Sequence, residues 1–293
     1  MKYSEVLKQA TEKLSLAGNK EAKLDAWYLM EEVSKMSRTQ WYLDCQNEMP
    51  KEKQEEFNRM LLRLLAGEPV SYIIGTRGFM GYDFVVDENV LIPRQDTELL
   101  VEKAIIIATK HLAKKSLATN ESLKVLDMCT GSGCIAISID KMLRESGQQV
   151  SVSAADISEG ALKTATLNNE RLGANVEFIH SDMFDSVSGK YNMIVSNPPY
   201  IESETVLTLD ENVRNFEPHL ALDGGQDGLD FYPTITKKAF TSLSKGGTLA
   251  FEIGYNQGVA VTEIMKKTGF ENVEIIKDLA SNDRVVIGSK LTE

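Results

Sequence analysis

The sequence predicts an α/β protein with an open, mostly parallel sheet and a smaller helical domain before it. Two patterns carry this prediction. From Leu123 onward, short apolar runs alternate with amphipathic helical patterns, which is typical of a parallel α/β sheet. Before residue 75, apolar residues recur only at helical spacing. The 293 residues are enough for about two domains, and we place them at residues 1–75 and 93–293, with a connector at 76–92.

The first 75 residues are predicted to form helices only. Val6, Ala10 and Leu14 fall on one helical face, and Phe57 and Leu61 fall on another. Two interpretations remain open for this domain. It is either a cap on the larger domain or a module that recognises a macromolecular substrate.

The connector changes from helical spacing to strand-like alternation. Phe79, Phe84 and Val86 alternate with other residues and are interrupted by Gly78 and Gly81. Glycines between short alternating runs are typical of a β-hairpin, which we therefore expect at residues 76–92.

A helix and then the sheet are expected after the connector. Residues 93–98 open the helix, with Asp96 or Thr97 as its N-cap. The strands that we expect are Lys124–Met128, Val150–Ala155, Val176–His180, Met193–Ser196, Thr248–Ile253, Val273–Ile276 and Arg284–Gly288. Because ligands bind beyond the carboxyl ends of the strands in such sheets, motifs at strand ends are the candidate site.

The first strand leads into a turn of small residues, Asp127-Met128-Cys129-Thr130-Gly131-Ser132-Gly133. Small residues let the backbone turn sharply, approach a ligand closely and lead into a helix N-terminus. The second strand ends at Asp156, whose carboxylate suits the two hydroxyls of a ribose or the cap of the next helix. The turn alone leaves two cofactors open, NAD and S-adenosylmethionine, and the acidic Asp127 suits the cationic side of the second.

The fourth strand is followed by the tetrapeptide Asn197-Pro198-Pro199-Tyr200. The two prolines fix φ twice and remove two backbone donors, so the Asn197 side-chain oxygen and the Pro198 carbonyl remain as acceptors. This pair matches a planar NH₂ group, which has two donors, and Tyr200 offers it a flat face. Such a site orients an amide-like nitrogen toward the methyl group of S-adenosylmethionine. The alternative is a rigid turn without a ligand.

With this tetrapeptide, three further segments make the sequence resemble the peptide chain release factor glutamine N5-methyltransferases: Gly67–Gly75, Pro93–Glu98 and Arg214–Pro218. The resemblance covers essentially the whole chain. It implies a seven-stranded, Rossmann-like methyltransferase sheet that uses S-adenosylmethionine and releases S-adenosylhomocysteine. It also implies that a cytoplasmic enzyme methylates the glutamine amide in the Gly-Gly-Gln motif of class 1 release factors, which the helical N-terminal domain helps to recognise.

The resemblance also implies the roles of individual residues. The cofactor-binding set is Asp127, Cys129, Thr130, Gly131, Ser132, Gly133, Asp156, Asp182, Met183 and Asn197. The substrate-binding set is Asn197, Pro198, Pro199 and Tyr200, of which Asn197, Pro198 and Tyr200 are also the expected catalytic residues. Met183 is expected beside the adenine, with Asp182 as an acceptor for its amine. Two residues depart from the family pattern, since Cys129 replaces a usual glycine and Met183 a frequent aromatic residue.

Composition and charge exclude several classes of protein. A net charge of −11 argues against a protein that holds nucleic acid by neutralising phosphates. No apolar run approaches the ~18 residues of a membrane span, and the N-terminus lacks the apolar region of a secretory signal. The three cysteines suit a reducing cytosol, and the three histidines lack metal-ligand spacing, so no metal site is expected. Residues 201–230 carry eight acidic residues and one arginine, which fits either a solvated loop or attraction to a basic protein surface.

Four alternatives to the release factor enzyme are weaker. An adenine-N6 methyltransferase would need a basic groove for nucleic acid, which the acidic loop at 201–230 disfavours. These motifs do not distinguish the release factor enzyme from a glutamine methyltransferase that acts on a ribosomal protein. An NAD-dependent oxidoreductase does not explain residues 197–200, and a binding protein without activity would not need the acceptors there.

Overall fold

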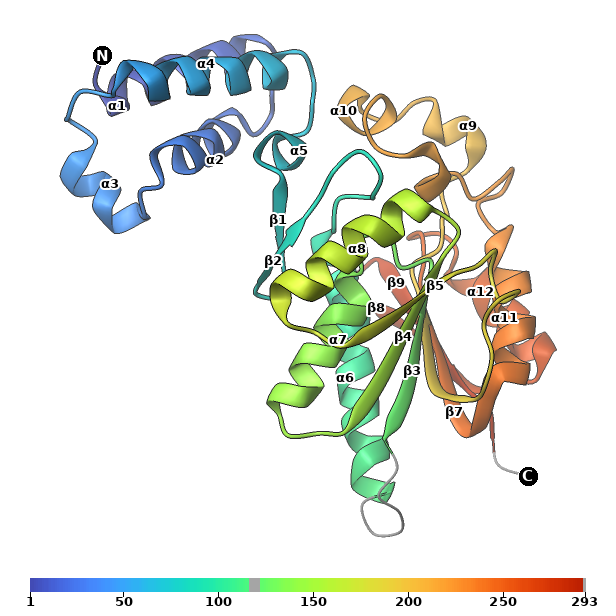
Figure 1. The fold of residues 1–293 in the computed structure, drawn as a ribbon. Coiled ribbons are helices and arrows are strands. Elements are labelled where there is room, and N and C mark those ends of the chain that lie inside the picture. Colours follow the sequence, from blue (N-terminus) through green and yellow to red (C-terminus); the bar gives the residue numbers. More distant parts are fainter. Residues whose placement is uncertain (116–121, 292–293) are drawn as a thin grey trace. The chain divides into compact units, whose positions relative to one another are not determined.

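The computed structural model describes residues 1–115 and 122–291, and the described chain forms two compact units (Figure 1). One unit contains Met1–Thr76 together with Asp210–Phe216, and the other contains Arg77–Leu209 and the chain from Glu217 onward. The short segment at 210–216 was not expected in the first unit. Among the described residues, no helix is long and apolar enough to cross a membrane.

The first unit is a bundle of helices, as the apolar spacing predicts. Its helices are α1 (Tyr3–Leu16), α2 (Ala22–Ser34), α3 (Arg38–Asp44), α4 (Lys51–Leu65), α5 (Val70–Ile74) and α10 (Glu211–Arg214). Leu14, Leu29 and Phe57 from three of these helices are completely or almost completely buried in one core. Asp210, at the start of the added segment, pairs with Lys20 at 3.9 Å between Nζ and Oδ2.

The second unit contains the predicted seven-stranded sheet, in the order β5-β4-β3-β6-β7-β9-β8. The strands are β3 (Leu123–Met128), β4 (Val150–Asp156), β5 (Val176–His180), β6 (Tyr191–Ser196), β7 (Leu243–Glu252), β8 (Glu271–Lys277) and β9 (Asp283–Ser289). The first five are parallel, whereas β9 runs antiparallel to both β7 and β8. The connector forms a separate two-stranded sheet of β1 (Thr76–Phe79) and β2 (Tyr82–Val85).

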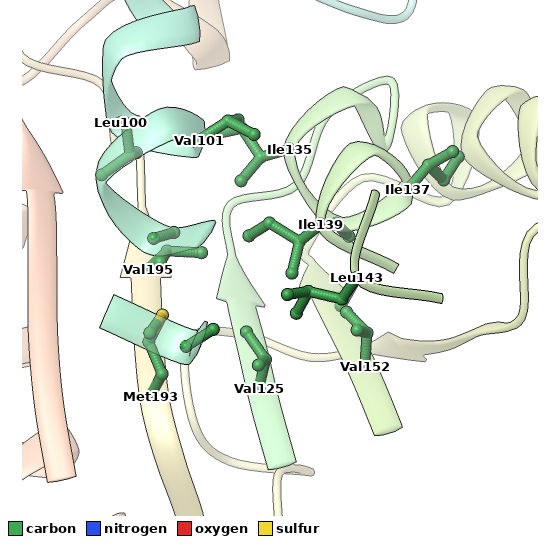
Figure 2. Packing of buried hydrophobic residues seen from close by; sticks show 14 of the residues in the cluster. Leu100, Val101, Val125, Ile135, Ile137, Ile139, Leu143, Val152, Met193 and Val195 are labelled. Carbon is green, nitrogen blue, oxygen red and sulfur yellow. The ribbon is translucent and has the colours of Figure 1, made fainter. Parts of the chain in front are cut away.

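Helices cover both faces of this sheet. The covering helices are α6 (Gln95–Lys115), α7 (Cys134–Glu145), α8 (Glu159–Leu172), α11 (Phe231–Ser242) and α12 (Gly258–Thr268). The unit also contains the short helix α9 (Ser203–Val206) and a 3₁₀ turn at His219–Ala221. Val125 of β3 packs against α6 and α7 in one cluster (Figure 2). Its neighbour Leu126 packs against α11 and α12 in a second cluster. Successive strand residues point to opposite faces, so strands buried on both sides need apolar residues at every position.

The predicted N-cap of α6 is wrong. Neither Asp96 nor Thr97 caps the helix, because α6 already begins at Gln95, and the Thr97 N–H donates to the Arg94 carbonyl at 3.1 Å. Pro93 fixes φ just before the helix and allows this earlier start. The Thr97 side chain is therefore free for another contact, and it is only 2% exposed.

Candidate functional site

A pocket lies beyond the carboxyl ends of β3, β4 and β6, where the sequence analysis expects the ligand. Eight of the predicted site residues line it: Cys129, Thr130, Gly131, Ser132, Asp156, Met183, Asn197 and Pro199. The other predicted residues, Asp127, Gly133, Asp182, Pro198 and Tyr200, do not line it. Arg94 and Thr97 from the start of α6 add polar groups to the wall, and Leu220 adds an apolar one.

The turn after β3 has a left-handed backbone at three positions. The φ angles are 63° at Cys129, 53° at Gly131 and 79° at Gly133. A left-handed conformation costs little for glycine and more for other residues, which is a physical reason for the glycine that the resemblance implies at the position of Cys129. Gly133 also permits close packing, because an added Cβ would lie 3.0 Å from Cδ1 of Ile137 and 3.1 Å from Cβ of Ala165, and its contact with a cofactor stays a prediction.

Asp127 stabilises this turn through hydrogen bonds to its side chain. Its Oδ2 accepts hydrogen bonds from the Thr130 hydroxyl at 2.6 Å and from the Ala136 N–H at 3.2 Å. The carboxyl group is completely buried, and this burial raises its pKa to about 7 against the effect of those two bonds. Its Oδ1 has no hydrogen-bond partner among the described residues, so one buried acceptor remains. A direct contact of Asp127 with a cofactor remains a prediction.

Asp156 joins two parts of the pocket wall. Its Oδ2 accepts from the Gly131 N–H at 2.8 Å, and its Oδ1 accepts from the Ser158 N–H at 2.9 Å. The N-cap of α8 is Ser158, whose hydroxyl accepts from the Ala161 N–H at 3.1 Å. Burial raises the pKa of Asp156, and the bonds from these backbone N–H groups oppose that rise. Because a carboxylate has about four acceptor positions, Asp156 retains acceptors for ligand hydroxyls.

The two predicted site residues that follow β5, Asp182 and Met183, differ in whether they line the pocket. Met183 lines the pocket with φ at 46°, which again is a left-handed backbone at a residue other than glycine. Asp182 is exposed and does not line the pocket. The predicted contact of Asp182 with an adenine amine therefore finds less support in the geometry than the contact of Met183.

The Asn-Pro-Pro-Tyr tetrapeptide presents Asn197 at the pocket wall with a defined orientation. Asn197 Nδ2 donates to the Thr97 hydroxyl at 3.4 Å, and no described residue donates a hydrogen bond to the side-chain oxygen of this amide. The Tyr200 hydroxyl donates to Glu252 Oε1 at 3.3 Å. Burial, followed by the charge of Glu252, raises the pKa of Tyr200, so that its hydroxyl stays protonated.

The backbone of the tetrapeptide is fixed from behind. Gln257 Nε2 donates to the Tyr200 carbonyl at 2.9 Å and to the Gly228 carbonyl at 3.1 Å. A Cβ added to Gly224 would lie 2.7 Å from Cα of Tyr200 and 2.8 Å from the carbonyl oxygen of Pro199. Backbone packs directly on backbone here, and Gly224 is the residue that permits it.

We expect Gly224→Ala to displace the tetrapeptide and to lower the rate of whatever reaction this site carries out about ten- to a hundred-fold, because a shift of about 1 Å in positioning groups costs rates of this order. The measure is the steady-state turnover rate, with folding followed by the thermal midpoint. Gly78→Ala is the matched control, since its new Cβ would meet only Asp83 Oδ1 at 3.8 Å. Equal activity of the two variants would contradict the assigned role of Gly224.

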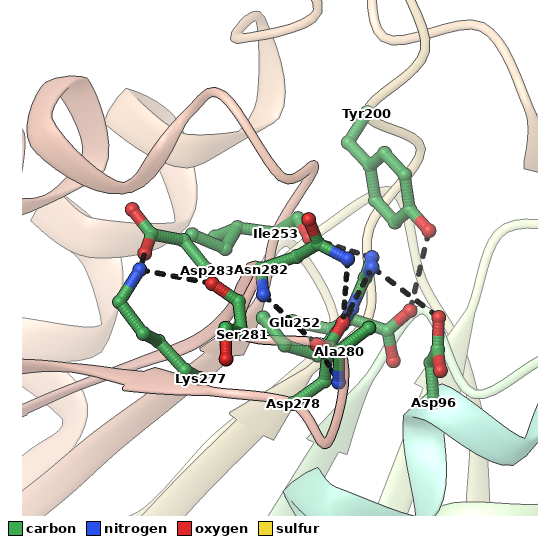
Figure 3. A network of polar contacts seen from close by, with 11 residues as sticks. Asp96, Tyr200, Glu252, Ile253, Lys277, Asp278, Ala280, Ser281, Asn282 and Asp283 are labelled. Atoms are coloured by element: carbon green, nitrogen blue, oxygen red, sulfur yellow. Dashed lines mark hydrogen bonds and ion pairs between the residues drawn. The ribbon is translucent and has the colours of Figure 1, made fainter.

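A partly buried polar network lies next to Tyr200 (Figure 3). Glu252, at the end of β7, is 1% exposed. Arg284 of β9 lies beside it and contacts Asp278 at 3.1 Å, Asp96 at 3.3 Å and the Ile253 carbonyl at 3.3 Å. The network thus joins α6, β7 and the turn between β8 and β9 at the site.

The sequence analysis did not identify four residues that hold this site: Thr97, Gly224, Glu252 and Gln257. Glu252 gave a signal that could have been used, since it is an acidic residue at the end of an apolar strand. The consecutive glycines Gly224 and Gly225 gave a weaker signal, because a glycine pair can mark a close approach of backbone to backbone. The roles of Thr97 and Gln257 depend on neighbours far away in the sequence, and no local pattern marks them.

Comparison with protein families divides the chain in a similar way. Residues 5–75 match the model described as PrmC N-terminal domain. Residues 99–226 match the model described as Methyltransferase small domain.

Curated relatives match nearly the full chain. The chain is 37% identical to the release factor glutamine methyltransferase of Agrobacterium fabrum, over 94% of this chain and 93% of that protein. It is 36% identical to the protein of the same name from Enterococcus faecalis, over 98% of each. It is 39% identical to that from Neisseria gonorrhoeae, over 91% and 93%.

A solved structure shares the fold at low identity. The hMettl16 catalytic domain, crystallised with the MAT2A 3'UTR hairpin 6, aligns with a TM-score of 0.55 and 14% identity, over 83% of this chain and 84% of that one. At this identity the likeness concerns the Rossmann-like methyltransferase fold alone.

Proposed function

The chain belongs to the family of release factor glutamine methyltransferases, and we propose from this that it methylates the side-chain amide nitrogen of the glutamine in the Gly-Gly-Gln motif of class 1 release factors. The observation that carries the proposal is the acceptor arrangement at Asn197. Its amide nitrogen is engaged by Thr97 and its oxygen is free, as recognition of a planar NH₂ group requires.

S-adenosylmethionine is the proposed cofactor, and the donor set of the pocket fits it. Asp156 retains acceptors for the ribose hydroxyls after its two backbone bonds. The left-handed turn at Cys129 to Gly133 allows close approach of the backbone, and Met183 offers a soft apolar contact for the adenine. When bound, this cofactor supplies a methyl group on a cationic sulfur and leaves as a neutral thioether.

The residues of the chain contribute orientation and electrostatics to this transfer. The Asn197 oxygen and the Pro198 carbonyl accept the two N–H bonds of the substrate amide and aim its nitrogen at the methyl carbon. As the new N–C bond forms, the nitrogen gains positive charge, which both acceptors stabilise. The amide then releases one proton to solvent water, so that the product amide is neutral. The proposed machinery consists of Asn197, Pro198 and Tyr200.

The partner in this proposal is a protein, not a nucleic acid. The acidic segment around residues 201–230 disfavours a phosphate backbone and favours a basic protein surface. The helical N-terminal unit is proposed to help recognise the release factor, and residues 76–92 are proposed as its connector to the catalytic domain. A cytoplasmic location is also proposed, since the three cysteines are free thiols.

The proposal predicts which atom receives the methyl group. We expect the purified protein to transfer label from S-adenosylmethionine to a bacterial class 1 release factor, and transfer to fall to background when glutamine of the Gly-Gly-Gln motif is replaced by alanine. Mass spectrometry of the labelled peptide locates the added methyl. Equal labelling of both release factors, or labelling of an adenine-containing DNA or RNA instead, would refute the function.

A further inference from the structure

Asn168 on α8 is a completely buried polar residue that the proposed site does not yet include. A buried amide is costly unless its donors and its acceptor are satisfied, and those of Asn168 are satisfied by backbone groups. Its Oδ1 accepts from the Val85 N–H at 2.7 Å, and its Nδ2 donates to the Val85 carbonyl and to the Ser132 carbonyl, both at 3.0 Å. One side chain therefore joins the end of β2 to the turn that follows β3.

The partners of Asn168 require an amide side chain. The Val85 N–H needs an acceptor, whereas the two carbonyls need donors, so one side chain must supply an acceptor and two N–H protons. A carboxylate supplies acceptors only, and a hydroxyl supplies a single proton. Because backbone groups cannot exchange their roles, the three bonds fix the orientation of this amide.

The same face of α8 meets the connector at two further turns of the helix. The Thr164 hydroxyl, one turn before Asn168, donates to Asp87 Oδ2 at 2.9 Å. At Gly160, a further turn before, an added Cβ would lie 2.6 Å from Asn89 Oδ1. Residues four apart lie on one helical face, so Gly160, Thr164 and Asn168 form a stripe along α8. The stripe thus contacts alternate residues of the connector.

Both segments that Asn168 joins continue into the pocket. After β2, the connector reaches Asn89, Val90 and Leu91, which line the pocket and are called the connector wall here. On the other side, the turn at residues 129–133, called the cofactor turn here, lines the pocket as well. The spacing of these two parts of the pocket is therefore set where one side chain is bonded to both segments.

We propose that Asn168, supported by Thr164, is a positioning residue that holds the connector wall and the cofactor turn at the spacing that the cofactor requires. The inference rests on the proposed cofactor, S-adenosylmethionine, because both parts belong to its pocket. Without the amide, both backbone groups of Val85 lose a partner, and so does the carbonyl of Ser132, which is only 2% exposed. Both segments then shift until other groups satisfy these atoms, and the pocket no longer has the shape that its ligand needs.

The first variant is Asn168→Asp in the full chain. Aspartate has the same shape and keeps the acceptor for the Val85 N–H, but it replaces both donors by an oxygen that faces two carbonyls. Affinity for S-adenosylmethionine, measured by calorimetry, is expected to fall about ten- to a hundred-fold, as for buried carbonyls that lose their donors. At saturating cofactor and release factor, kcat is expected to stay close to wild type, because the change lies outside the tetrapeptide.

Asn169→Ala is the matched control on the same helix. The Asn169 Oδ1 accepts from the Val176 N–H at 3.0 Å, so this variant also removes an amide that binds backbone, but it does so at the start of β5. Both variants are expected to lower the thermal midpoint, and affinities are compared at a temperature well below both midpoints. Only Asn168→Asp is expected to weaken cofactor binding.

Thr164→Val is the second variant, and it decides the question if Asn168→Asp does not fold. Valine keeps the shape of threonine and removes the hydroxyl that donates to Asp87. Because one hydrogen bond to the connector is lost while the bond to Ser132 remains, affinity for S-adenosylmethionine is expected to fall about two- to ten-fold.

Hydrogen exchange of the ligand-free chain gives a readout that needs no cofactor. In the cofactor turn, the Gly131 N–H donates to Asp156 Oδ2 at 2.8 Å and the Gly133 N–H donates to the Thr130 carbonyl at 2.9 Å. Exchange at these two amides is expected to become faster in Asn168→Asp and to stay at the wild-type rate in Asn169→Ala. A rise spread evenly over the whole sheet would instead mean general destabilisation and would contradict a positioning role.

The outcomes separate this inference from the proposed function. Wild-type affinity in a folded Asn168→Asp or in Thr164→Val, or an equal loss in Asn169→Ala, would overturn the inference while the function stands. If wild type binds S-adenosylmethionine but does not methylate the Gly-Gly-Gln glutamine, the proposed substrate is wrong and the affinities still decide the inference. If wild type does not bind S-adenosylmethionine, the proposed cofactor is wrong and the dependence of its binding on Asn168 is overturned with it.

Discussion

Replacing Asn197 by alanine is expected to lower methyl transfer by at least about a hundred-fold, because it removes a preorganised acceptor for the charge that develops on the amide nitrogen. The structure positions this acceptor firmly, with Nδ2 held by Thr97 and the following backbone held by Gln257. The loss should appear in kcat, measured with saturating release factor and S-adenosylmethionine.

The cofactor affinity provides the control for this variant. Asn197 contributes one polar group to the pocket wall, so binding of S-adenosylmethionine by calorimetry should fall less than in a variant of Asp156. Turnover at the wild-type rate in Asn197→Ala would refute the mechanism. If only the affinity for the cofactor falls, the role of Asn197 is cofactor binding and not the transfer step.

Asp156→Ala is expected to show the opposite pattern. The variant loses the acceptors proposed for the ribose and releases the N–H groups of Gly131 and Ser158 that the carboxylate now holds. Because the variant loses the charged acceptor for the ribose hydroxyls, we expect the affinity for S-adenosylmethionine to fall about ten- to a hundred-fold. Calorimetry measures this loss, and kcat should largely recover at saturating cofactor.

A graded series sharpens the test of Asp156. Asp156→Asn keeps one acceptor oxygen and the size of the side chain, so its affinity should lie between those of wild type and Asp156→Ala. If the alanine variant binds S-adenosylmethionine as tightly as wild type, Asp156 only stabilises the turn and does not bind the cofactor.

The sheet could be predicted because its signal is local. Buried parallel strands need apolar residues on both faces, so runs such as residues 193–196 stand out without any knowledge of their neighbours. The tetrapeptide was informative for a similar reason, since two prolines remove donors wherever they are placed. The region of the pocket followed from the strand ends.

The contacts that hold the tetrapeptide in place could not be predicted in this way. Glu252 meets Tyr200 across 52 positions of sequence, and Thr97 meets Asn197 across 100. No period or propensity encodes such pairs. The N-cap error at Asp96 and Thr97 has the same origin, because the side chain of Thr97 is drawn into the interior by tertiary contacts that outweigh the local capping preference.

The segment at 210–216 makes the two units inseparable by a single cut. The chain passes between the units three times, near residues 76, 209 and 216. A fragment that ends at residue 76 would lack the partner of Lys20 and the ring of Phe216, which lies against Gly67. The complementary fragment would carry that segment without Lys20 and Gly67, which contact it. The first unit is thus completed by a segment that lies between two parts of the second in the sequence, and deletion or domain exchange in this protein requires two junctions inside the acidic loop as well as one at the connector.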